Sequence, residues 1–289
     1  MSRLKMIDPS CLETLADLRI EIDRIDAALH QLLMERGEII HRLIEAKSRQ
    51  GGGLAFRPGR EADMMRALVS RHRGLLPLDT VESIWRIIIS TFTFVQSNYS
   101  VHADISGGDA AMRDCCRFHF GFTVPYIPHQ GAARVIEAVA KSGGDLGVVR
   151  VLTPEGPWWR GLAKPGAPKI IARLPFVERP DHPAGMPVFI IAQPLAEAAV
   201  HDVVLYDVEI PDNLEYRAHP GPLGPGVEIL NRFKAESGLR LMIAAEAGNG
   251  LAEWRETLIR AGAAEPRITE IGSHAARFDA SSIQKVAAQ

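Results

Sequence analysis

A long apolar seam near the N-terminus constrains this chain more than any other feature of its sequence. Its ten positions are spaced three or four residues apart, and all except Arg36 are apolar: Leu15, Leu18, Ile22, Ile25, Leu29, Leu32, Ile39, Leu43 and Ala46. Ser10–Glu13 has the form of a capping box, and Gly51–Gly53 ends the pattern. The predicted helix of about 38 residues is about 57 Å long. Because that exceeds the width of a small domain, we infer a dimer in which the long helices pair.

One position of the seam, Arg36, carries a permanent positive charge. An unpaired buried guanidinium is costly, so an acidic side chain or an anionic ligand should meet it. Taken alone, Arg36 is also compatible with a salt-bridged or snorkelling arginine. Lys47 follows 11 residues later and projects within roughly 20° of Arg36. Arg19 lies about 100° around the helix and roughly 25 Å away, so it reaches the same site only from a partner helix.

Composition excludes several classes of protein. The chain is 46% hydrophobic and 24% charged, with a net charge of −2, so nothing indicates a nucleic-acid partner. We find no signal-peptide pattern and no apolar run of membrane-spanning length. Cys11, Cys115 and Cys116 are odd in number and two are adjacent, which argues against a disulfide framework and fits a reducing cytoplasm. No Cys/His spacing is typical of zinc, and we expect no metal and no cofactor.

The pattern predicts a multidomain α + α/β protein. Residues 1–103 are expected to form a three-helix bundle, with a second helix over Pro58–Arg73 and a third opened by a capping box at Asp79–Glu82. In residues 104–200, strand patterns alternate with a helical pattern, as is typical of β-α-β units. Their expected elements are a helix over Ala132–Lys141 and strands over Val124–Ile127, Asp145–Val151, Lys169–Leu174 and Val188–Ala192.

Residues 201–289 are predicted to form a small terminal β-α-β-α-β unit. Its expected order is strand Val203–Ile210, helix Val227–Ser237, strand Leu239–Ala244, helix Leu251–Ala261 and strand Arg267–Ile271.

Polar side chains on the other two helices complete a candidate site. Arg60 and Glu61 begin the second helix, and Gln96 closes the third. With Arg19, Arg36 and Lys47 they form a set without a nucleophile, a general base or a metal ligand. Such a set suits a small dianion held by charge-assisted, forked hydrogen bonds. Lys47 and Glu61 also have the plainer explanation of complementing helix dipoles.

Residues 10–100 resemble the all-helical class of chorismate mutase. The resemblance rests on Leu18-Arg19-Ile20-Glu21-Ile22-Asp23-Arg24-Ile25-Asp26, Leu33-Met34-Glu35-Arg36, Glu45-Ala46-Lys47, Phe56-Arg57-Pro58-Gly59-Arg60-Glu61-Ala62, and Trp85-Arg86-Ile87-Ile88 through Gln96. It implies an intertwined homodimer with two equivalent sites. Arg36, Lys47, Arg60, Glu61 and Gln96 would line one site, and Arg19 would enter from the other subunit.

The reaction implied by this resemblance is the Claisen rearrangement of chorismate to prephenate in aromatic amino-acid biosynthesis. Arg19 and Arg36 would clamp the two carboxylates of chorismate, with Arg60 adding to their field. Lys47 and Gln96 would meet the ether oxygen where negative charge develops, and Glu61 would accept the ring hydroxyl. Two positions depart from the family: Phe92 stands where a small residue is frequent, and Arg57 stands where some members are acidic.

Residues from about Ile105 to Val151 resemble prephenate dehydratase. The matching segments are Phe118-His119-Phe120-Gly121, Val135-Ile136-Glu137-Ala138-Val139 and Gly147-Val148-Val149. Leu152-Thr153-Pro154 replaces that family's Glu-Asn-Ser, and the nearest counterpart of its Thr-Arg-Phe motif is Ala184–Phe189. We interpret this half as a reduced, inactive relative. Pro220-Gly221-Pro222-Leu223 resembles the turn of a regulatory ACT domain, whose second ligand-binding motif is missing.

Two other functions stay open. The same cations could hold isochorismate, which would make the chain an isochorismate-pyruvate lyase on the same scaffold. The chain could also be a non-catalytic dimer whose C-terminal half binds an aromatic metabolite. Phe92 favours this second alternative, because a bulky ring at that position crowds the site.

Overall fold

The computed structural model describes residues 14–49, 56–153, 156–179, 181–194, 200–211, 223–235, 238–249, 251–260, 263 and 265–279. Two compact units divide the chain, Met1–Gly53 and Leu54–Gln289. The N-terminal unit holds helix α1 (Leu15–Arg49). Within the described parts of the chain, no helix combines the length and the apolar character that crossing a membrane requires.

Helix α1 begins at a capping box one turn later than expected. The Thr14 backbone N–H donates to Asp17 Oδ2 at 3.0 Å, and the Asp17 N–H donates to Thr14 Oγ1 at 3.2 Å. The cap predicted at Ser10–Glu13 lies outside the described residues. At 1.5 Å per residue, the 35 residues of α1 are about 52 Å long.

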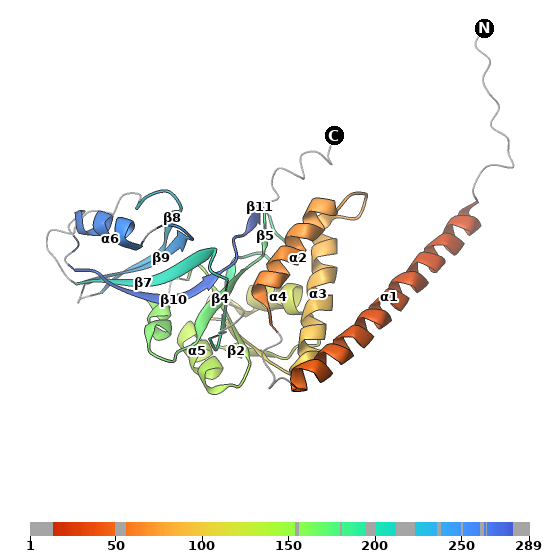
Figure 1. Ribbon diagram of the computed structural model, residues 1–289, viewed down its shortest axis with the longest axis horizontal. Helices are drawn as coiled ribbons and strands as arrows, with labels where there is room; N and C mark the ends of the chain where they lie inside the picture. Colours follow the sequence, from red (N-terminus) through yellow and green to blue (C-terminus); the bar gives the residue numbers. More distant parts are fainter. Residues whose placement is uncertain are drawn as a thin grey trace, which may run out of the picture. The chain divides into compact units, whose positions relative to one another are not determined.

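The larger unit combines helices with a nine-stranded sheet (Figure 1). Its helices are α2 (Pro58–Arg71), α3 (Leu78–Gln96), α4 (Asp109–Phe120), α5 (Ala132–Lys141), the 3-10 helix η2 (Trp158–Ala163) and α6 (Leu251–Arg260). Its sheet strands are β1 (Val101–Asp104), β2 (Tyr126–His129), β3 (Leu146–Arg150), β4 (Lys169–Leu174), β6 (Val188–Ala192), β7 (Val203–Pro211), β8 (Val227–Ala235), β9 (Gly238–Glu246) and β10 (Arg267–His274). A separate pair joins β5 (Val177–Glu178) to β11 (Phe278–Asp279).

The sheet has the strand order β2-β1-β3-β6-β4-β10-β7-β9-β8. Strands β1, β2 and β3 are parallel and are connected through α4 and α5. Strand β6 runs antiparallel to β3 and β4, and the last four strands join through a parallel contact between β10 and β4. The regions 104–200 and 201–289 therefore contribute to one continuous sheet.

Gly272 makes the join between β10 and β4 possible. It pairs with Ile170, and a Cβ at Gly272 would lie 2.1 Å from the Ile170 carbonyl oxygen. Its φ of +145° is also one that side-chain-bearing residues rarely adopt. Only glycine allows the two backbones to come this close.

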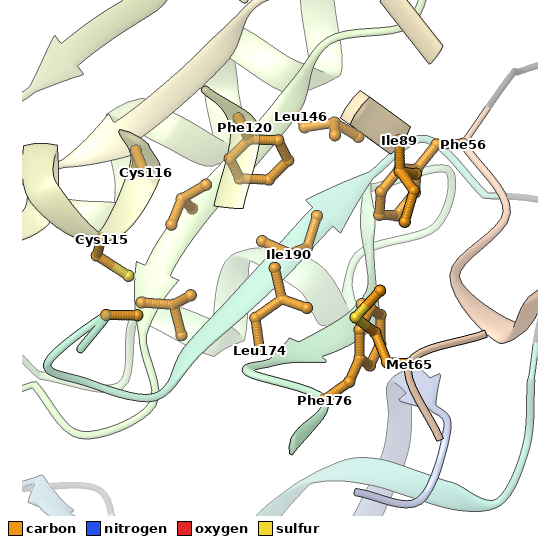
Figure 2. Close-up of a cluster of buried hydrophobic side chains, with 14 of the residues drawn as sticks. Phe56, Met65, Ile89, Cys115, Cys116, Phe120, Leu146, Leu174, Phe176 and Ile190 are labelled. Carbon is orange, nitrogen blue, oxygen red and sulfur yellow. The ribbon is translucent and has the colours of Figure 1, made fainter. Parts of the chain in front are cut away.

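Alternation along β6 separates two cores on opposite faces of the sheet. Val188, Ile190 and Ala192 face one core, whereas Phe189 and Ile191 face the other. The first core also contains residues of α2, α3 and α4, including Met65, Ile89 and Phe120 (Figure 2). The second core contains α5 and η2, and α6 covers β7 and β9 through a third.

The first core extends across the boundary predicted near residue 103. Phe56 and Met65 on the helical side share it with Leu174 and Phe176 on the sheet side (Figure 2). Helices α2 and α3 therefore pack as part of the α/β unit.

Two local predictions were wrong. The segment predicted as helix Val227–Ser237 is strand β8, so the terminal region is β-β-β-α-β rather than β-α-β-α-β. The successive apolar residues Ile229 and Leu230 break strand alternation in the sequence and imitate helical spacing, and in the sheet a β-bulge between Ile229 and Asn231 accommodates them. The capping box predicted at Asp79–Glu82 is also absent, because α3 begins at Leu78 after Pro77 and no side chain caps it.

Candidate active site

The six predicted site residues are divided between the two units. Helix α1 carries Arg19, which is exposed, and Arg36 and Lys47, which are both partly buried. Helix geometry separates Arg36 from Lys47 by about 16 Å along the axis and keeps them on one side. Arg60 and Glu61 lie in the first turn of α2, and Gln96 ends α3.

The seam of α1 is largely exposed in the single chain. Ile22 is 56% exposed and Leu32 is 62% exposed, and the seam leucines and isoleucines between and beyond them are exposed as well. A continuous apolar stripe of this length on one helix is unusual for a surface that stays in water. It provides the face that a second long helix would need.

Arg60 and Glu61 are adjacent in sequence but differ in their surroundings. The Arg60 side chain is exposed, whereas Glu61 is 5% exposed. Arg86 Nη1 on α3 donates to Glu61 Oε2 at 2.6 Å, and Arg86 is itself 1% exposed. The Arg86 guanidinium also lies over the Phe176 ring, 5.5 Å from its centroid. The pair thus joins α2, α3 and the sheet side of the core.

The charge of Glu61 is sensitive to its burial. Removal from water raises the pKa of the Glu61 carboxyl, and the positive charge and hydrogen bond of Arg86 oppose that rise. Its second oxygen, Oε1, accepts no hydrogen bond from any residue in the described ranges. One oxygen of Glu61 is therefore held by Arg86 while the other remains available as an acceptor.

Gln96 is held by its own helix. Its Nε2 donates to the Phe92 carbonyl oxygen at 3.0 Å, one turn earlier, and both side chains are partly buried. One of the two residues predicted to meet the ether oxygen thus donates to a main-chain carbonyl of its own helix.

Sequence reasoning did not identify Arg86 as a partner of Glu61. A signal existed, because Arg86 interrupts the apolar run Trp85–Val95 in the same way that Arg36 interrupts its seam. The partner itself is 25 residues away on another helix, and no local pattern specifies that pairing.

A second buried ion cluster anchors α3 to the sheet side. Arg179 Nη1 donates to Glu82 Oε2 at 3.0 Å, and His182 Nε2 lies 3.2 Å from the same oxygen. Arg179 also contacts Asp79. Glu82 therefore binds residues about 100 positions away instead of capping its helix. Across the described ranges, no group of His, Cys, Asp and Glu side chains could hold a metal ion.

Comparison with known proteins relates the N-terminal third to one family. Residues 18–97 match the model of the family "Chorismate mutase type II". A bifunctional chorismate mutase/prephenate dehydratase of Aquifex aeolicus is 29% identical over 144 residues, which is 48% of this chain and 39% of that protein. The bifunctional enzyme of Neisseria gonorrhoeae is 36% identical over 78 residues, or 27% of this chain and 21% of that protein. The chain thus spans well under half the length of these relatives.

A solved structure, prephenate dehydratase from Streptococcus mutans, aligns with 62% of this chain and 99% of its own at 12% identity and a TM-score of 0.41. A likeness at this level does not establish a shared fold. The Aquifex match, by contrast, is longer than the stretch 18–97, so similarity to a bifunctional relative continues beyond the mutase part. The resemblance predicted from the sequence is confirmed: residues 18–97 carry a domain of the chorismate mutase type II family.

Proposed function

We propose that this protein is a chorismate mutase, converting chorismate to prephenate in aromatic amino-acid biosynthesis. The observation that carries the proposal is the family match over 18–97, because that range contains all six candidate site residues. The reaction is an intramolecular rearrangement, so a site without nucleophile, general base, metal or cofactor suits it. Catalysis would come from holding the reactive conformer and stabilising developing charge.

Each candidate residue has a role in the proposed site. Arg36 and the partner subunit's Arg19 hold the two carboxylates of chorismate, and Arg60 adds positive potential. Lys47 and Gln96 stabilise the ether oxygen as the C–O bond breaks. Glu61 accepts the ring hydroxyl through Oε1, while Arg86 fixes the carboxylate through Oε2. Arg86 is therefore a positioning residue in this proposal.

The proposal includes a homodimer with sites shared between subunits. Its support is the exposed apolar seam of α1 and the angular position of Arg19, which places it off the Arg36–Lys47 side of its own helix. A cytoplasmic location is proposed with it, and the unpaired thiols of Cys115 and Cys116 are consistent with a reducing compartment. The dehydratase-related half is proposed to lack dehydratase activity.

The test is to incubate the purified chain with chorismate and to quantify prephenate, phenylpyruvate and pyruvate. We expect prephenate alone. Arg36→Ala should abolish turnover, whereas Arg42→Ala, an exposed arginine of the same helix, should not. Phenylpyruvate would show a working dehydratase half, and pyruvate would support the lyase alternative.

Survival of chorismate would contradict the proposal. It would favour the non-catalytic dimer, for which the specific observation is the hydrogen bond that holds Gln96 against the Phe92 backbone.

A further inference from the structure

A short segment of the dehydratase-related half packs against the buried face of helix α3. It comprises residues 176–182, of which the structure describes all but position 180. Arg86 Cζ lies 5.5 Å from the centroid of the Phe176 ring. Arg179 Nη1 donates to Glu82 Oε2 at 3.0 Å. Because Glu82 and Arg86 are four residues apart on α3, the segment contacts one face of that helix at two successive turns.

The segment is itself fixed by the C-terminal strand β11. Strand β5, which belongs to the segment, pairs with β11 in parallel, and the Phe278 N–H donates to the Phe176 carbonyl oxygen at 2.8 Å. The Phe176 side chain is 3% exposed and belongs to the core that α2, α3 and α4 share with the sheet (Figure 2). The ring that faces Arg86 is therefore held from the sheet side of the core.

The Arg86 guanidinium has few other supports. It is buried, and within the described ranges Nη1 is its one nitrogen with a hydrogen-bond acceptor, namely Glu61 Oε2. Nε and Nη2 are buried and donate to no described residue. A cation over an aromatic face is stabilised most where water is excluded, so Phe176 is a second group that keeps this guanidinium in place.

The position of Arg86 in turn affects the charge of the Glu61 carboxyl. Burial raises the pKa of Glu61, and the charge and hydrogen bond of Arg86 oppose that rise. Two further titratable side chains lie near this pair, Tyr99 and, on α4, His119. Burial raises the pKa of Tyr99 and lowers the pKa of His119 well below its usual value, so neither side chain is charged near pH 7. The ionisation of Glu61 therefore depends on how closely Arg86 is held.

We propose that the segment 176–182 positions the Glu61 carboxylate of the proposed mutase site, with Phe176 acting through Arg86. The inference rests on the proposed function. It gives the half without the dehydratase motifs a role in the rearrangement, because the acceptor of the substrate hydroxyl depends on a side chain from that half. Phe176 is a positioning residue, since it acts on Glu61 only by holding Arg86.

The pKa of Glu61 can be measured in the full chain by ¹³C NMR of its carboxyl group. Phe176→Met fills a similar volume without an aromatic face, so Arg86 should be held less closely and the pKa of Glu61 should rise by about half a pH unit or more. Phe120→Met is the matched control and should leave that pKa unchanged. Phe120 is buried in the same core, but no arginine in the described ranges lies over its ring.

The dependence of kcat/KM for chorismate on pH gives a second readout. The acidic limb of this profile reports the ionisation of Glu61 in the free enzyme. Phe176→Met should move that limb upward and lower kcat/KM along it about threefold or more. In an Arg86→Met background, Phe176→Met should cause no further loss, because its effect passes through Arg86. A merely structural role for Phe176 would add its loss in that background as well.

An unchanged pKa of Glu61 in a folded Phe176→Met chain would overturn the proposal, as would an equal rise in Phe120→Met. If Phe176→Met does not fold, nuclear Overhauser contacts between the Arg86 side chain and the Phe176 ring in the natural chain decide, and their absence would overturn the proposal. A natural chain that leaves chorismate unchanged would contradict the proposed function. The NMR titration needs no turnover, so it separately decides whether the segment holds Glu61.

Discussion

At the scale of single residues, this chain is defined by arginines in apolar surroundings. Arg36 was recognisable from the sequence because it breaks a regular seam. Arg86 interrupts an apolar run in the same way, but its pairing with Glu61 joins two helices across 25 residues, and no local pattern specifies that pairing. Local patterns thus reveal a buried cation but not its partner.

Removing one member of the buried Glu61–Arg86 pair should lower the free energy of unfolding. Arg86→Ala leaves Glu61 buried without its counter-ion, and loss of one member of such a pair costs about 3–5 kcal/mol. We expect urea denaturation to show that loss in the free energy of unfolding. Arg113→Ala, which removes an exposed pair with Asp109, should cost less than about 1 kcal/mol. Equal effects for the two variants would contradict the role assigned to Arg86.

Acid should destabilise the larger unit through His274. Its pKa is lowered from 6.5 to about 4 in the folded chain, so the unfolded chain binds the proton first as pH falls. The folded chain is not destabilised by His274 above pH 6.5. As the pH falls from 6.5 toward 4, the free energy of unfolding decreases progressively, by about 3 kcal/mol in total. His274→Gln should flatten the pH dependence of the free energy of unfolding over that window. An unchanged slope in this variant would exclude His274 as its source.

At the scale of elements, the helices and strands with the clearest sequence patterns were the ones predicted correctly. Strands β4 and β6 have the predicted bounds. In β6 a continuous apolar run marks a strand that is covered on both faces, and in β4 the apolar residues Ile170, Ile171, Ala172 and Leu174 give a similar signal. Helix α4 was missed although its buried residues repeat with helical spacing. Four of the five are Met112, Cys115, Cys116 and His119, which carry a weaker apolar signal than leucine or valine. The strand β1 was also missed, because the alternation of apolar and polar residues in Val101–Asp104 extends over only four positions.

The join between β4 and β10 should depend on Gly272. In Gly272→Ala the new Cβ overlaps the Ile170 backbone, which cannot move aside as a flexible side chain could. We expect a loss of about 3 kcal/mol or more, measured by thermal or urea unfolding. Gly143→Ala is the control, since a Cβ there meets nothing within 4 Å. A stable Gly272→Ala chain would show that the two parts of the sheet are not closely joined.

At the scale of the whole molecule, the sequence predicted the change from helices to α/β structure near residue 100. It did not predict that α2 and α3 share a core with the sheet, or that residues 104–200 and 201–289 form one sheet. Both features depend on contacts between distant segments. The apolar seam of α1, by contrast, was predicted from the spacing of its residues, and its exposure supports the proposed dimer.

The most direct test of the central proposal mixes two inactive variants. Arg19→Ala and Arg36→Ala should each be inactive as homodimers, because every site lacks one carboxylate clamp. After unfolding and refolding together, heterodimers should contain one site with both arginines. Statistical mixing then restores about a quarter of the natural chorismate mutase activity. No recovery in mixtures that demonstrably form heterodimers, or full activity of Arg19→Ala alone, would contradict a chorismate mutase site shared between subunits.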